Sequence, residues 1–231
     1  QDGTLAWRLL PLGIGLLAVA VVPLSMLSSD SSFFDPTVYY TPLGGPLTAT
    51  VGALAMAGAT LLLALLLVHR ARGAVLPRRV RLAGLVVAIA LGPWLLRALA
   101  AGVAPPPGGV ADHLWLAWEV SLFLVNAAFL IAIAGAGSAV VFPGTRRGLP
   151  PAVAPIVAAV AAAFAPVALQ APGVWPAWYV ALWAVAAVCL VGARPHRRLV
   201  LAAGAVAALG ATTLTWNAGV RGRIALANRD V

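Results

Sequence analysis

Apolar runs of about 20 residues follow one another along almost the whole chain, and no other feature constrains the fold as strongly. A run of that length is what an α-helix needs to cross the hydrocarbon core of a bilayer. Short stretches rich in Arg, Pro or Gly separate the runs and end the helices. The pattern predicts an all-α fold, a polytopic transmembrane bundle of about seven helices. The expected spans are residues 7–27, 48–68, 82–101, 113–141, 151–170, 175–193 and 199–215.

The scarcity of charge agrees with a lipid environment. Charged residues make up 9% of the chain and hydrophobic residues 62%, whereas soluble domains carry about 25% charged residues. The net charge of +9 comes from Arg residues that lie mostly in the short connections, where a membrane protein places them. We therefore expect a lipid bilayer as the main partner and exclude nucleic acid. Residues 1–215 are expected to form the bundle, and residues 216–231 a polar tail that begins an extracytoplasmic segment.

The distribution of Arg predicts the orientation. The connections after the second, fourth and sixth spans are rich in Arg, and those after the first, third and fifth contain none. Because Arg-rich loops stay in the cytoplasm, the amino terminus is predicted to be cytoplasmic and the tail external. The three Arg residues of the tail run against this rule. The chain has 15 basic residues and all are Arg, which with its many Ala, Gly and Pro residues indicates a GC-rich bacterial genome and hence a bacterial inner membrane.

Tryptophan gives a second indication of depth. Most of the Trp residues fall near the predicted outer ends of the spans, where rings with a polar edge favour the headgroup level. In the last span Ala recurs every four residues, which lets helix backbones approach closely. The six Trp residues are Trp94, Trp115, Trp118, Trp175, Trp178 and Trp216, and the Ala residues are Ala203, Ala207 and Ala211.

Arg97 and Glu119 stand out as charges inside predicted spans. Such charges are costly in lipid, so they usually pair or face a cavity. Both lie a few residues from the outer ends of two consecutive spans joined by a short connection. We expect an Arg97–Glu119 ion pair that clamps the two helices; the alternatives are a ligand or ion site and an Arg97 side chain that extends to the headgroups.

The fourth span carries further polar residues. Asp112 is placed to cap its amino end, His113 and Ser121 follow, and Glu119 and Asn126 are seven residues apart on one face with Asp112. This face is expected to turn into the bundle, either for hydrogen bonds between helices or for a substrate path. Asp112, His113, Asn126, Arg97 and Glu119 are the candidate binding residues for a small ligand of unknown identity.

No cofactor is expected. The absence of Lys excludes a retinal Schiff base, and His69, His113 and His196 fall near helix ends rather than as a facing pair for haem. The sequence has no metal-binding spacing, phosphate-binding loop or catalytic constellation, which leaves enzymatic activity undecided. The single Cys189 lies in an apolar run and is expected to be a small core residue.

Three segments resemble the multi-helix amino-terminal membrane regions of bacterial sensor histidine kinases. They are Phe34–Tyr40, the pair Gly102–Pro106 and Leu114–Glu119, and the tail from Trp216 to Asp230. The resemblance implies a membrane-embedded sensor region of a signal-transducing protein, without the kinase core and without kinase activity of its own. The alternative function is a small transporter or permease-type subunit that uses the Arg97–Glu119 region, and a homodimer stays open for either.

Overall fold

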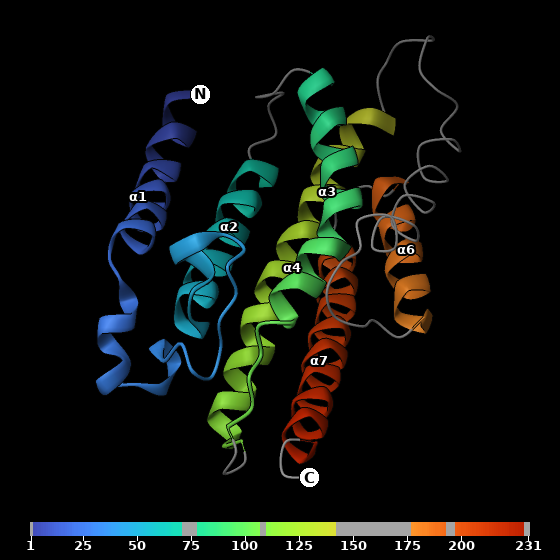
Figure 1. Cartoon of the computed structure of the whole chain (residues 1–231). Coiled ribbons are helices and arrows are strands. Elements are labelled where there is room, and N and C mark those ends of the chain that lie inside the picture. The colour runs from blue at the N-terminus through green and yellow to red at the C-terminus, as the bar shows by residue number, and fades with distance from the viewer. Residues whose placement is uncertain (1, 71–77, 107–109, 142–176, 193–196, 229–231) are drawn as a thin grey trace.

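The computed structural model describes residues 2–70, 78–106, 110–141, 177–192 and 197–228 (Figure 1). This part of the chain is all-helical, as predicted, and instead of a β-sheet it holds one isolated bridge between Tyr39 and Val103. The predicted span 151–170 lies outside the described residues. The described α-helices are α1 (Asp2–Val21), α2 (Val51–Arg70), α3 (Arg78–Ala100), α4 (Asp112–Val141), α6 (Ala177–Gly192) and α7 (Arg197–Ala227).

Three of these helices are long and apolar enough to cross a membrane. Their qualifying stretches are Val51–Val68, Ala83–Ala100 and Asp112–Ala136, and a shorter apolar stretch, Ala6–Val21, lies in α1. The 30 residues of α4 correspond to a rod of about 45 Å at 1.5 Å per residue. Three of the seven predicted apolar spans are therefore helices of spanning length among the described residues.

Two predicted boundaries are wrong. The expected helix 7–27 ends at Val21, because Pro23 adopts a non-helical ψ of 87° and a 3₁₀ turn, Leu24–Ser29, follows. The last helix does not end at 215 but continues to Ala227. Hydropathy falls after residue 215, but the residues there include good helix formers and no Pro, so nothing in the backbone stops the helix.

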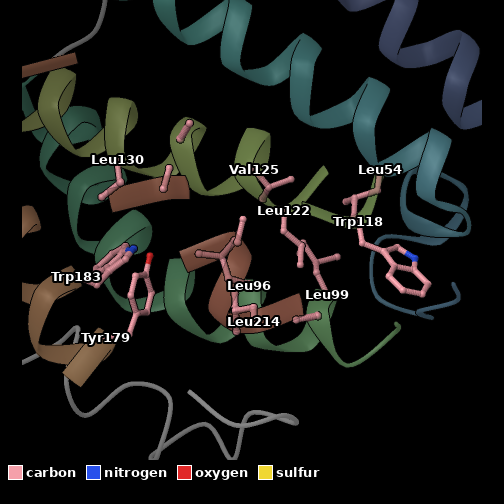
Figure 2. Packing of buried hydrophobic residues seen from close by; sticks show 14 of the residues in the cluster. Leu54, Leu96, Leu99, Trp118, Leu122, Val125, Leu130, Tyr179, Trp183 and Leu214 are labelled. Atoms are coloured by element: carbon pink, nitrogen blue, oxygen red, sulfur yellow. The ribbon is translucent and has the colours of Figure 1, made fainter. Parts of the chain in front are cut away.

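Helix α4 is the centre of the bundle. It packs against α2, α3, α6 and α7, whereas α1 contacts α2 and the short turn that precedes it. Because α4 is apolar on all sides, it can be surrounded by other helices. Its Leu122, Leu130 and Ile133 are almost completely buried in the core shown in Figure 2.

Small residues set the close approach of the neighbouring helices. Ala203, Ala207 and Ala211 are all buried on α7, as their spacing predicted. On α2, a Cβ at Gly58 would lie 3.1 Å from side-chain atoms of Leu124 and Val125 on α4. Cys189, by contrast, is exposed and not a core residue. The buried stripe of α6 is Tyr179, Trp183, Ala187 and Leu190, and Cys189 lies outside it.

The two ends of the bundle differ in character. The amino terminus and the end of α7 lie at opposite ends (Figure 1). The connections 22–50 and 101–111, as far as they are described, fold over the end that also holds the last turns of α7. We call these two connections the cap. Arg70, Arg78 and Arg197, at the ends of α2, α3 and α7, mark the opposite end.

Candidate functional site

The cap contains two of the stretches on which the resemblance rests, Phe34–Tyr40 and Gly102–Pro106. The backbone N–H of Tyr40 donates to the Gly102 carbonyl at 3.0 Å, and that of Ala104 donates to the Val38 carbonyl at 3.1 Å. These bonds pair the connection between α1 and α2 with the one between α3 and α4. A Cβ at Gly102 would lie 2.7 Å from the Tyr40 carbonyl oxygen, so only glycine permits this approach.

Tyr39 fixes this pairing to the end of α3. Its ring is 1% exposed, and its hydroxyl donates to the Leu99 carbonyl at 3.0 Å. Burial raises the pKa of Tyr39 far above its ordinary value, because the phenolate would lose its hydration. The side chain therefore remains a neutral donor.

Asp35 shapes the turn that precedes this segment. Its Oδ1 accepts the backbone N–H and the hydroxyl of Thr37, both at 2.8 Å. The backbone hydrogen bond, followed by the side-chain hydrogen bond, holds the pKa of Asp35 below its usual value. The ionised carboxylate is thus the form that closes the turn.

His113 and Asp112 begin α4 beneath the cap. His113 Nε2 lies 3.5 Å from Ser32 Oγ, and its ring meets Phe33 edge to face with centroids 6.0 Å apart. Asp112 is exposed in the first turn of α4, where its charge favours the helix dipole. His113 therefore connects the start of α4 to the 3₁₀ turn Ser32–Phe34, whereas Asp112 remains at the surface.

The end of α7 reaches the same region. The rings of Trp115 and Trp216 meet edge to face with centroids 6.3 Å apart. A Cβ at Gly219 would lie 3.0 Å from the Trp115 ring, and one at Gly222 would overlap Pro105. The part of the predicted tail up to Ala227 is thus helical and packs against α4 and the cap.

Arg97 and Glu119 lie where the sequence predicted, on α3 and α4, which pack together. Glu119 Oε1 accepts a hydrogen bond from Trp115 Nε1 at 3.1 Å, one turn earlier on α4. Arg97 lies near enough to Arg221 of α7 for the two positive charges to repel each other. Both side chains are half-buried. The ion pair between them stays a prediction.

Asn126 lies deeper and forms a hydrogen-bond network between three helices. Its Nδ2 donates to Tyr179 Oη at 2.8 Å and to the Ala207 carbonyl at 3.3 Å. Trp183 Nε1 donates to Asn126 Oδ1 at 3.2 Å, and the Tyr179 hydroxyl donates to the Val206 carbonyl at 3.1 Å. All three side chains are fully buried. We call Asn126, Tyr179 and Trp183 the interior network, and it joins α4, α6 and α7.

The interior network depends on Gly210. A Cβ at that position would overlap Tyr179 Oη and the amide of Asn126. Sequence reasoning identified Asn126 but missed Tyr179, Trp183 and Gly210. A helical pattern that is apolar on all sides gives no signal for which aromatic residue faces the centre. The signal that identified Asn126 was its amide side chain within a run of apolar residues.

One further prediction at the cap end needs correction. Trp118 is not in a headgroup belt, because it is 1% exposed inside the core (Figure 2). Its Nε1 is a buried donor without a hydrogen-bond partner among the described residues. Ser121 is also buried, and its hydroxyl lies 2.7 Å from the Ala117 carbonyl and 3.3 Å from the Val51 carbonyl of α2.

Comparisons with known proteins add no assignment. No protein-family model matches the chain, and no curated protein or solved structure matches it either. The described residues contain no group of three or more His, Cys, Asp or Glu side chains that could hold a metal ion. The cap and the interior network therefore form the candidate functional site among the described residues.

Proposed function

We propose that the chain is the membrane-embedded sensor region of a signal-transducing protein, with the cap as its receiving end. The cap gathers the aromatic and polar residues at one end of the bundle. The Arg residues of the opposite end give the orientation, since Arg-rich ends stay in the cytoplasm. The cap then faces the outside of a bacterial inner membrane, as does the end of α7.

One observation carries this proposal: α7 links the cap to the interior network without interruption. Trp216, Gly219 and Gly222 of this helix contact the cap end, and Val206, Ala207 and Gly210 contact the interior network. A helix moves as a rod over a few turns, so a change of packing at the cap shifts the network. This is the connection that a sensor of external signals requires.

The alternative function, a transporter, needs the interior to open. Transport sites lie near the bilayer midplane and are exposed alternately to each side. Each polar atom of the three network side chains already has a protein partner, and the network has little space for a substrate beside Gly210. The network resembles the hydrogen bonds that fix helices to one another in membranes. These contacts favour the sensor.

Cysteine accessibility separates the two functions. All variants carry Cys189→Ser. Ser121→Cys and Thr215→Cys place cysteine at two buried positions between the interior network and the cap. Ser28→Cys, at an exposed position of the cap, is the control. A membrane-impermeant maleimide applied to each side of proteoliposomes in turn is expected to label the control from the cap side only, and neither buried site from either side. Labelling of the buried sites from both sides at the rate of the control supports transport instead.

Hydrogen exchange tests whether a change of packing at the cap reaches the interior network through α7. Tyr39→Phe removes the bond to the Leu99 carbonyl and loosens the cap. If the chain is a sensor, the amides of α7 around Val206–Gly210 are expected to exchange faster in this variant than in the wild type. Faster exchange confined to the cap would contradict transmission through α7.

A further inference from the structure

A cavity of about 340 Å³ lies between the end of α1, the cap and the start of α2. Its volume is at the small end of ligand pockets, which measure about 300–1,000 Å³. Its lining includes Ala20 near the end of α1, Leu24 of the 3₁₀ turn that follows, and residues of the turn Pro42–Pro46. None of the residues that the interior network uses lines it. The cavity is thus separate from that network.

The wall formed by the turn has a defined shape. Gly44 and Gly45 both have positive φ, 88° and 58°, which non-glycine residues rarely adopt. The Thr48 hydroxyl donates to the Leu43 carbonyl and closes the turn. The cavity is therefore bounded by a fixed backbone.

Two buried Thr residues belong to the lining of the cavity. Thr41 is 4% exposed and Thr50 is 1% exposed. The Oγ1 of Thr41 accepts the Leu43 N–H at 3.3 Å, and that of Thr50 accepts the Ala53 N–H at 3.2 Å. Each oxygen acts as an acceptor in these bonds, so each hydroxyl retains its own proton to donate. A ligand that offers an acceptor oxygen would satisfy them.

The lining of the cavity excludes ions. Every described residue around it is uncharged, and most are aliphatic or Pro. A buried charge without a counter-charge is strongly unfavourable. The ligand must therefore be neutral, apolar over most of its surface, and able to accept hydrogen bonds.

We propose that this cavity binds a small uncharged carbonyl compound, with the carbonyl oxygen at the Thr41 and Thr50 hydroxyls and the apolar body against the α1 end. The same chemistry occurs in the ester linkage of a phospholipid and in a free ketone or ester. The site adds a ligand class to the proposed sensor and rests on that function for its purpose. The test measures binding alone, so the site can fail while the sensor function stands, and the reverse.

Benzophenone, a neutral ketone with two apolar rings, is a direct probe because it photolabels the groups that surround it. The full chain in phosphatidylcholine nanodiscs is irradiated with benzophenone, and the adducts are mapped by peptide mass spectrometry. Adducts are expected in segments 20–25 and 40–50. Ala20→Leu fills the cavity and should reduce these adducts to background. Ala18→Leu, the same change on the exposed face of α1, should leave them unchanged.

The hydroxyl contribution is tested in the same assay. Thr50→Val should lower the adduct yield about fivefold, the effect of one net hydrogen bond, and Thr50→Ser should restore it. Adducts spread evenly over the helices, or unaffected by Ala20→Leu, would overturn the site. Nanodiscs of ester-linked and ether-linked lipid identify the source. Weaker labelling in ester lipid supports a lipid carbonyl as occupant, and equal labelling supports a free compound.

Discussion

At the residue scale, Gly210 is the position where a single methyl group has the largest expected effect. The methyl group that Gly210→Ala adds would overlap both Tyr179 and Asn126. Overpacking of this kind typically lowers the free energy of unfolding by about 1–3 kcal/mol. Gly204→Ala, on the same helix with no atom within 4 Å of its added Cβ, is the matched control and should be neutral or slightly stabilising. Melting in detergent measures both, and equal melting temperatures would contradict the interior network.

Trp118 illustrates the opposite case, a buried donor whose loss is expected to be tolerated. Its Nε1 has no partner among the described residues, so Trp118→Phe removes an unpaired N–H but also some packing volume. We expect a smaller loss of melting temperature than for Trp183→Phe, because Trp183 Nε1 donates to Asn126. A larger loss for Trp118→Phe would mean that its indole N–H has a partner.

Asp35 makes the stability of the cap depend on pH. Its folded pKa is lowered by the Thr37 hydrogen bonds, so its contribution is fully present above the unfolded pKa, about 4. The contribution is lost as the pH falls through the folded value. Asp35→Asn should therefore flatten the decrease of melting temperature below about pH 4. An unchanged acid profile in the variant would show that Thr37 does not hold the carboxylate.

At the element scale, the sequence predicted helices better than helix faces. The apolar runs located α2, α3, α4 and α6 to within a few residues, because each run is bounded by Arg, Pro or Gly. The end of α7 was missed because helical structure continues where hydropathy falls. Tyr179 and Trp183 were missed because an all-apolar helix carries no amphipathic signal, and the packing of α4 against its neighbours decides which side faces inward.

The predicted ion pair between Arg97 of α3 and Glu119 of α4 can be tested by a double-mutant cycle. If Arg97 and Glu119 pair, Arg97→Gln and Glu119→Gln should each lower the melting temperature, and the double variant should recover part of the loss. Breaking a buried pair costs about 3–5 kcal/mol, and access of water near the cap end should reduce this figure. Additive losses of melting temperature would mean that Glu119 accepts the Trp115 hydrogen bond but does not interact with Arg97.

At the scale of the whole molecule, we propose a membrane-crossing bundle with its cap and the end of α7 on one side and its amino terminus on the other. The start of α1 and the end of α7 lie at opposite ends of the bundle. Arg70, Arg78 and Arg197 lie at helix ends opposite the cap, whereas Arg221 and Arg223 lie on the part of α7 near the cap. The proposed sensor function requires that the cap be outside the cytoplasm.

Sided labelling of single cysteines in intact cells tests this claim most directly. In the Cys189→Ser background, Ser28→Cys reports on the cap, Asn228→Cys on the end of α7, and Ala6→Cys on the amino terminus; all three positions are exposed. We predict that an impermeant maleimide labels residues 28 and 228 in intact cells, and residue 6 only after permeabilisation. Labelling of residues 28 and 228 from opposite sides, or of residue 6 in intact cells, would contradict it.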